Sequence, residues 1–248
     1  MKIGICTLAI GDEYSKAVEK CVISIKNYCN LHDYCFIMDD SVYDGTHPPA
    51  FCKIFLVQKY LKYFEYILWI DSDVFITNYG RKVEEFIDLL LPQNFMIIAQ
   101  HGLFYINTGV FLIRNCKEAN NFLTFWARQD SKCFNWEQPQ LHKALINLNV
   151  EGIQLIPHAF ANILNAESPL SHTNDSKIVH WLPGDFLVHF LCIEKEKINN
   201  LIESLSVTYD GKEGYEHIKK YKMLVICKQL NVVEKHSEIE LYPPYKLL

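Results

Sequence analysis

The stretch from residue 66 to residue 78, Tyr-Ile-Leu-Trp-Ile-Asp-Ser-Asp-Val-Phe-Ile-Thr-Asn, constrains the fold more than any other part of the chain. Its apolar residues from Ile67 to Ile70 do not alternate with polar ones, which is typical of a central strand covered on both faces by helices. Such strands belong to α/β proteins, where ligands bind at the carboxyl ends of the strands. Asp71 and Asp73 follow the run directly.

The two carboxylates are separated by one residue, so on an extended chain they point to the same side. They can then converge on one hard cation and leave coordination positions for phosphate oxygens. The same Asp-Ser-Asp sequence could instead cap a helix or form a turn, and short acidic motifs are common. Its position after an apolar strand favours the metal site.

The rest of the chain predicts alternating strands and helices, and therefore an α/β fold. Half of the 248 residues are apolar, enough for a substantial core, and no repeat or linker divides the sequence. Strands are expected at 2–10, 34–38, 95–99, 110–113, 153–156, 177–181 and 186–191. Helices are expected at 14–29, 51–64, 83–90, 117–128, 196–205 and 213–230, with another starting at 137, and a long loop over the site is expected at 157–176.

Composition excludes several classes of protein. The net charge of −5 and the lack of a Lys/Arg-rich run argue against a nucleic-acid partner. The chain has no apolar run of about 18 residues and no signal peptide at its start, so we expect a soluble, cytoplasmic protein without a transmembrane segment.

Its nine cysteines are odd in number and never form C-x-x-C, which favours reduced thiols over disulfides or a zinc site.

Five segments stand out together: residues 48–53 (Pro-Pro-Ala-Phe-Cys-Lys), 70–73, 106–115, 137–139 (Glu-Gln-Pro) and 184–190 (Gly-Asp-Phe-Leu-Val-His-Phe). In this order they resemble the retaining glycosyltransferases of family 34, the galactosyl-, mannosyl- and xylosyltransferases. The resemblance implies the glycosyltransferase-A fold, a Rossmann-like, mixed and mostly parallel sheet flanked by helices. Residues 1–192 would form the nucleotide-sugar-binding and catalytic core, and residues 193–248 a helical C-terminal appendage of the same domain.

The resemblance implies that Asp71, Asp73 and His189 form the site of a manganese ion, with Mg²⁺ as the other possibility. Asp73 and His189 would hold the ion directly, whereas Asp71 could bind it through water or contact the ribose of the nucleotide instead. Imidazole joins carboxylates readily at borderline divalent metals, whereas sites made only of oxygen suit Mg²⁺. The alternative for His189 is a hydrogen-bonded core histidine at the end of a strand.

The resemblance also implies that the donor substrate is a UDP-sugar. Thr7, Leu8 and Ala9, at the end of the first strand, would contact the base and ribose, with Ser72 beside them. Tyr14 could stack on the base or could simply be packed.

Positive charge at the diphosphate could come from Lys53, Lys195 or Lys197. Each of these lysines could instead be a solvated surface residue.

For the sugar, the resemblance places Asn107 within hydrogen-bonding reach of the donor, with Gly109 allowing close approach; the alternative is an ordinary turn before a strand. Glu137 would bind donor hydroxyls, or cap a helix, and Gln138 would lie beside the anomeric carbon. In a retaining reaction the acceptor hydroxyl attacks from the face that the diphosphate leaves, and a diphosphate oxygen takes its proton. An inverting reaction would need a carboxylate base, for which Glu137 is the candidate.

The chain departs from the family at two points. Family members usually continue after His-Phe with a small residue, glycine and cysteine, whereas Leu191 and Cys192 follow here. Close backbone approach to the diphosphate is therefore in question at this position. The chain also lacks the N-terminal anchor of eukaryotic members, as expected for a bacterial or viral enzyme or an excised catalytic domain.

Other classes stay open at this stage. A sugar nucleotidyltransferase should have a glycine-rich loop after the first strand, which residues 8–12 do not supply. A glycogenin-like glycosyltransferase should carry H-x-x-G-x-x-K-P-W near its C-terminus, which this chain does not. A non-catalytic nucleotide-sugar-binding or scaffold protein could keep the same site. The resemblance implies a glycan or glycoconjugate acceptor, but the sequence does not identify which acceptor, which donor sugar, which linkage or which oligomeric state.

Overall fold

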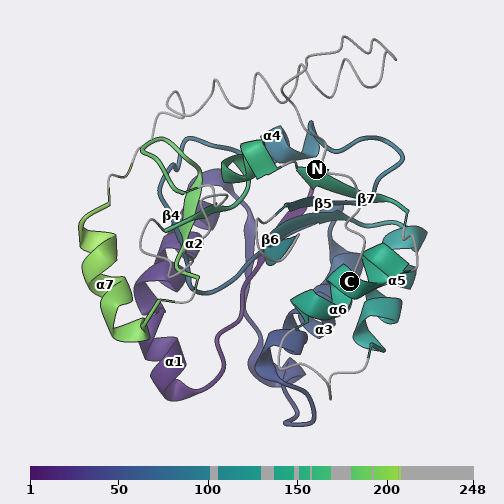
Figure 1. The fold of residues 1–248 in the computed structure, drawn as a ribbon, viewed down its shortest axis with the longest axis horizontal. Coiled ribbons are helices and arrows are strands. Elements are labelled where there is room, and N and C mark those ends of the chain that lie inside the picture. Colours follow the sequence, from purple (N-terminus) through teal and green to yellow (C-terminus); the bar gives the residue numbers. More distant parts are fainter. Residues whose placement is uncertain are drawn as a thin grey trace, which may run out of the picture.

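A computed structural model describes residues 1–100, 106–129, 137–147, 151–156, 158–168, 180–191, 193–205 and 207. Its main feature is a six-stranded sheet in the order β2-β1-β3-β6-β5-β7 (Figure 1). The strands are β1 (Ile3–Cys6), β2 (Cys35–Ile37), β3 (Tyr66–Ile70), β5 (Met96–Ala99), β6 (Asn107–Arg114) and β7 (Ile153–Ile156).

The sheet is mixed and mostly parallel. β1 pairs in parallel with β2 and β3, and β5 pairs in parallel with β7. β6 runs antiparallel to both of its neighbours, β3 and β5. The central position of β3 and the mixed α/β architecture confirm the predicted fold class.

A second, three-stranded sheet has the order β4-β9-β8 and comprises β4 (Val74–Ile76), β8 (Ala166–Glu167) and β9 (Leu187–His189). β4 is antiparallel to β9, which is parallel to β8. The long loop predicted at 157–176 is wrong for its described part, where a 3-10 helix (His158–Ile163) leads into β8. Residues 161–168 are buried, so packing gives this segment regular structure where its sequence suggested a loop.

The described helices are α1 (Asp12–Ala17), α2 (Glu19–His32), α3 (Cys52–Tyr60), α4 (Val83–Ile87), α5 (Lys117–Ala127), α6 (Gln138–Asn147) and α7 (Lys195–Glu203). Short 3-10 helices occupy Asp40–Val42, Pro49–Phe51 and Leu61–Tyr63. The single helix predicted at 14–29 is divided, because Val18 (φ −100°, ψ 8°) leaves the helical conformation between α1 and α2. The first strand ends at Cys6, earlier than predicted. The predictions for residues 177–179 and 213–230 lie outside the described residues.

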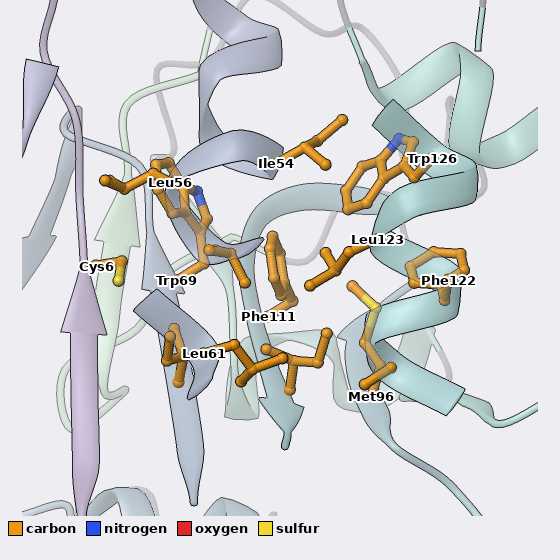
Figure 2. Packing of buried hydrophobic residues seen from close by; sticks show 14 of the residues in the cluster. Cys6, Ile54, Leu56, Leu61, Trp69, Met96, Phe111, Phe122, Leu123 and Trp126 are labelled. Atoms are coloured by element: carbon orange, nitrogen blue, oxygen red, sulfur yellow. The ribbon is translucent and has the colours of Figure 1, made fainter. Parts of the chain in front are cut away.

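The core explains why the run before the aspartates is continuously apolar. Leu68 and Ile70 of β3 face the cluster that contains Ile25 and Tyr28 of α2. Ile67 and Trp69 face the opposite cluster, which α3 and α5 cover. Figure 2 shows this second cluster, with Trp69 and Phe111 on the sheet and residues such as Ile54, Phe122 and Trp126 on the helices. Both faces of β3 are buried, as the sequence predicted.

A third cluster joins α7 to the rest of the chain. Ile198 and Ile202 of α7 are buried in the same cluster as Val18, Cys21 and Phe190. Figure 1 shows α7 beside α1 and α2. The expected appendage at 193–248 is described only as far as residues 193–205 and 207, and this part packs on the core. The domain boundary itself stays a prediction.

The described cysteines are free thiols, as the sequence indicated: Cys6, Cys21, Cys29, Cys35, Cys52 and Cys116. Burial raises the pKa of the Cys52 thiol to about 11, so it is protonated at neutral pH. Cys133, Cys192 and Cys227 lie outside the described residues.

Candidate metal and nucleotide site

Asp71, Asp73 and His189 converge at the carboxyl end of β3, where their ligand atoms all lie within 4.8 Å of one another. The chain turns immediately after β3, where the Val74 amide donates to the Asp71 carbonyl at 3.1 Å. β4 then pairs with β9 so that Val74 lies opposite His189, and the Phe190 amide donates to the Asp73 carbonyl at 3.0 Å. The two sheets therefore bring His189 to the aspartates.

His189 is buried, and its Nε2 lies 3.4 Å from Asp73 Oδ1. Its Nδ1 is also buried and has no hydrogen-bond partner. A Cβ atom at Gly109 would overlap Cε1 of this ring and would lie 2.8 Å from Nδ1. Gly109 therefore gives the His189 imidazole the space it needs beside β6.

These three side chains fit a divalent metal ion. Two carboxylates and one imidazole are a donor set suited to borderline divalent metals, and three protein ligands leave coordination positions for a substrate. Asp73 and His189 are buried, and Asp71 is partly exposed. This burial keeps the three side chains in one arrangement. His189 lies buried at the end of β9 beside Asp73, and its role as a metal ligand stays a prediction.

Asp71 is held by two neighbours through one oxygen. Its Oδ1 accepts a hydrogen bond from Trp69 Nε1 at 2.7 Å and lies 2.9 Å from Lys53 Nζ. Burial and the charge of Asp73 raise the pKa of the Asp71 carboxyl against the opposing effect of Lys53. The second oxygen of Asp71 is the one left for a metal or a ribose.

Lys53 is buried between two carboxylates, so its interpretation as a solvated surface lysine is wrong. Its Nζ lies 2.6 Å from Glu137 Oε1 and 2.9 Å from Asp71 Oδ1, and it donates to the Thr108 carbonyl at 3.2 Å. Burial alone would lower its pKa, but the two carboxylates outweigh this and raise it. Lys53 thus carries a fixed positive charge between Asp71 and Glu137.

Lys195, the first residue of α7, pairs with the other metal-site aspartate. Its Nζ lies 3.0 Å from Asp73 Oδ2 and 5.0 Å from the centre of the Tyr14 ring. Burial raises the pKa of Asp73, but its contacts with His189 and Lys195 outweigh this and lower it. Lys197 is exposed and pairs with Glu194 at 2.7 Å, so it matches the surface interpretation.

Glu137 and Gln138 meet Thr108 of β6. Thr108 Oγ1 donates to Glu137 Oε1 at 2.6 Å, and the Thr108 amide donates to Gln138 Oε1 at 3.0 Å. Glu137 is buried directly before α6, where its carboxylate binds Lys53 and Thr108. The acid–glutamine pair is therefore linked through Lys53 to Asp71.

Asn107 belongs to β6, so its interpretation as part of an ordinary turn before a strand is wrong. Its Oδ1 accepts from the Gly109 amide at 2.8 Å, and the Gly109 carbonyl accepts from the Asp71 amide at 2.7 Å. The pairing of β5 with β6 shifts between Ile98 and Ala99, which leaves residues 108–110 outside the regular register. This irregularity places the Asn-Thr-Gly segment against the metal cluster.

The predicted nucleotide residues at the end of β1 are buried and lie beside the same edge, because β1 and β3 are parallel neighbours. Thr7, Leu8 and Ala9 are all buried, and Thr7 Oγ1 has no hydrogen-bond partner. Ser72 Oγ donates to the Tyr14 hydroxyl at 3.4 Å. Burial, followed by the charge of Asp73, raises the pKa of Tyr14, so it is a neutral phenol.

The sequence did not predict roles for two residues that contact the candidate site. Trp69 was expected only as a strand residue, although an indole two positions before an aspartate can donate a hydrogen bond to that aspartate. Thr108 lay inside a recognised motif without a role. Their partners are fixed by strand geometry and by α6, so no local sequence signal beyond the presence of a hydrogen-bonding side chain identifies them.

The fold and this site define a class. A mixed sheet with an Asp-x-Asp turn after its central strand, joined by a histidine from a small second sheet, is the glycosyltransferase-A fold. A glycosyltransferase involved in the glycosylation of the major capsid of PBCV-1 has a TM-score of 0.63 at 21% identity, over 83% of this chain and 100% of that chain. The apo structure of the bifunctional enzyme WbbM gives 0.55 at 10% identity, over 90% of this chain and 52% of that chain.

The family follows from the sequence comparison. The model described as "Protein of unknown function, DUF273" matches residues 25–180, more than half of the chain, so the chain belongs to this family. Xyloglucan 6-xylosyltransferase 2 of Arabidopsis thaliana is 30% identical over 138 residues, 51% of this chain and 29% of the relative. Probable glycosyltransferase 2 of Oryza sativa subsp. indica is 26% identical over 139 residues, 53% of this chain and 28% of the relative.

These relatives confirm the resemblance to glycosyltransferase family 34. The chain matches less than a third of the length of each of them. Among the helices of the described part of the chain, none is long and apolar enough to cross a bilayer.

Proposed function

We propose that this protein is a metal-dependent, retaining glycosyltransferase that moves a hexose or pentose from a UDP-sugar to a hydroxyl of a glycan or glycoconjugate acceptor. The observation that carries the proposal is the convergence of Asp71, Asp73 and His189 at the carboxyl end of β3 in a glycosyltransferase-A fold. The relationship to xyloglucan xylosyltransferases supports the same reaction class.

Asp71, Asp73 and His189 would hold the divalent ion, Mn²⁺ for this mixed donor set and Mg²⁺ as the second choice. When bound, the ion supplies Lewis-acid neutralisation of the leaving diphosphate. Lys53 and Trp69 orient Asp71 through one oxygen, so its other oxygen faces the ligand side.

The nucleotide would bind along the edge formed by residues 7–9 and Ser72. Thr7 Oγ1 is a buried hydroxyl without a partner, which a ribose or base could satisfy. Tyr14, which Ser72 contacts, is the aromatic side chain available to the nucleotide at this edge. Lys195 would move from Asp73 to the diphosphate oxygens.

The donor sugar would lie against Asn107, Glu137 and Gln138. Gln138 uses its carbonyl oxygen to accept from Thr108, so its amide nitrogen is the group left to donate to the sugar. Glu137 uses Oε1 for Lys53 and Thr108, so contact with a donor hydroxyl would fall to Oε2.

Retention of configuration fits these contacts better than inversion. An inverting reaction needs a free carboxylate base, and Glu137, the candidate, is already paired with a buried lysine. In the retaining reaction the acceptor hydroxyl attacks on the face that the diphosphate leaves. Its proton passes to a diphosphate oxygen, so the chain need not supply a base.

The test is release of UDP from a panel of UDP-xylose, UDP-glucose and UDP-galactose, with and without Mn²⁺. We expect release from one of these only with the metal, and a loss on the order of 10²-fold in Asp73→Asn, which removes a charged ligand. Asp40→Asn, at an exposed acid outside the cluster, is the control. Full activity in Asp73→Asn would disprove the site.

Binding of a UDP-sugar without release, in protein shown to be folded, would instead support the non-catalytic nucleotide-sugar-binding alternative.

A further inference from the structure

Lys195 pairs with the same carboxylate that a cation bound by Asp73 would contact. Asp73 has two oxygens, and each already has a neighbour: Oδ2 lies 3.0 Å from Lys195 Nζ, and Oδ1 lies 3.4 Å from His189 Nε2. A metal ion bound by Asp73 and His189 would lie against the same carboxylate. Two cations this close repel strongly in a partly buried site.

The two lysines of the cluster differ in how firmly they are held. Lys53 is 6% exposed and is bound by Asp71, Glu137 and the Thr108 carbonyl. Lys195 is 35% exposed, and its contacts are Asp73 and the face of the Tyr14 ring. Lys53 is therefore fixed by the fold, whereas Lys195 can leave Asp73 by rotating its own side chain toward solvent.

The position of Lys195 in α7 is unfavourable for the helix alone. It is the first residue of α7, where the helix dipole favours acids over bases. Its partner Asp73 lies 122 residues earlier in the chain, so the contact that compensates for this position is tertiary.

We propose that Lys195 competes with the divalent ion for Asp73: in the metal-free protein its ammonium neutralises the carboxylate, and metal binding displaces it. This inference rests on the proposed function, because it takes Asp71, Asp73 and His189 as a divalent-metal site. The metal alone then binds weakly. A ligand carrying a diphosphate offers the displaced ammonium a new partner, so nucleotide and metal strengthen each other's binding.

Titration of the full chain with Mn²⁺, without nucleotide, tests the competition by measuring the dissociation constant directly. Lys195→Met keeps a long apolar stem that can still pack on Tyr14, but removes the charge. We expect it to bind Mn²⁺ about tenfold more tightly than the wild type, which corresponds to about 1.4 kcal/mol. Lys195→Arg keeps the charge and should bind no more tightly than the wild type.

Lys197→Met is the matched control. It makes the same change of charge two residues further along α7, but Lys197 is exposed and pairs with Glu194. Its Mn²⁺ affinity should stay within about twofold of the wild type, because screened surface charges act weakly at a distance. An equal gain in both methionine variants would show a general charge effect and would overturn the proposal.

The second measurement repeats the titrations with saturating UDP. The gain of Lys195→Met should then disappear, because the wild-type ammonium has moved to the diphosphate. If Lys195→Met binds Mn²⁺ no more tightly than the wild type without nucleotide, the competition between Lys195 and the metal is overturned. The proposed metal site would still stand if His189→Ala weakened Mn²⁺ binding. Failure of every protein to bind Mn²⁺ would overturn both this inference and the proposed metal site.

Discussion

At the scale of single residues, the arrangement of Asp71, Asp73 and His189 depends on neighbours outside the proposed ligand set. Gly109 provides the space for the His189 ring, and Trp69 fixes one oxygen of Asp71. Lys53 links that aspartate to Glu137. Each of these contacts can be removed by one substitution that leaves the proposed ligands themselves unchanged.

Gly109→Ala should disturb the cluster through His189. The added Cβ would overlap the buried ring, which has to shift away from Asp73. We expect a loss of about 1–3 kcal/mol in the free energy of unfolding and a tenfold or larger loss of Mn²⁺ affinity, measured by urea unfolding and metal titration. Gly4→Ala is the control, because its Cβ would crowd Ile37 and Phe64, away from the aspartates. Wild-type metal affinity in Gly109→Ala would contradict this role.

Trp69→Phe should weaken metal binding by removing one of the two contacts that hold Asp71 Oδ1. It keeps an aromatic ring that can pack on Phe111 but loses the 2.7 Å hydrogen bond. We expect a drop of several-fold in Mn²⁺ affinity and a loss of about 1–3 kcal/mol in unfolding free energy. Trp126→Phe makes the same change in the same core (Figure 2), and its indole donates to a backbone carbonyl. Equal effects on metal affinity in both variants would refute a specific role for Trp69.

At the scale of secondary-structure elements, the site lies where the small sheet meets the main one. β9 presents His189 only because β4 continues directly from the Asp-Ser-Asp turn and pairs with it. The turn before β9 is fastened by Asp185, whose oxygens accept from the Leu182 amide at 2.8 Å and from Asn162 Nδ2 at 3.0 Å. The position of the histidine thus depends on a buried acid outside the proposed metal site.

The raised pKa of Asp185 predicts that the free energy of unfolding depends on pH. Burial raises its pKa to about 6, above the value near 3.9 in an unfolded chain, so the folded protein holds this proton more strongly. Its contribution to stability is therefore full below about pH 4 and is lost as the pH rises to about 6.

Asp185→Asn cannot ionise and should remove this component. Urea unfolding at pH 4.5 and pH 7 should show that the wild type loses more stability than the variant on going to pH 7, by on the order of 2 kcal/mol. Asp40→Asn, at an exposed acid, should behave as the wild type. The same pH profile in Asp185→Asn and the wild type would show that Asp185 has an ordinary pKa.

At the scale of the whole molecule, a ligand at the proposed site would contact elements from both sheets. The cluster joins the ends of β3 and β9, and α7 reaches it through Lys195. A ligand bound there stabilises only the state in which these distant segments are together. Binding should therefore appear as stabilisation of the whole fold.

Thermal unfolding with Mn²⁺ and a panel of UDP-sugars should show this effect. At 100 times the dissociation constant a ligand adds about 2.7 kcal/mol, which for a chain of this size raises Tm by about 5–10 °C. We expect the shift for one UDP-sugar, only with metal, and its loss in Asp73→Asn. A Tm shift of equal size without Mn²⁺ would show that the UDP-sugar binds without a metal ion at Asp71, Asp73 and His189.

The local pattern of the sequence determined much of this protein. The apolar run from Ile67 to Ile70 indicated a strand buried on both faces, and Asp71 and Asp73 at its end indicated the edge that carries the site. These features follow from residues that are neighbours in the chain, because periodicity and chain direction are properties of short segments. The ends of elements were less predictable, as at Val18, where packing divides one predicted helix.

Only the tertiary structure decided which charges face one another. Lys53 reaches the Thr108 carbonyl across 55 positions of sequence, and Lys195 reaches Asp73 across 122. A lysine in a helical pattern has the same local signature whether it ends in water or between two carboxylates. Its environment is set by how whole elements pack, so the burial of Lys53, the space at Gly109 and the pairing of Lys195 with Asp73 required the folded chain.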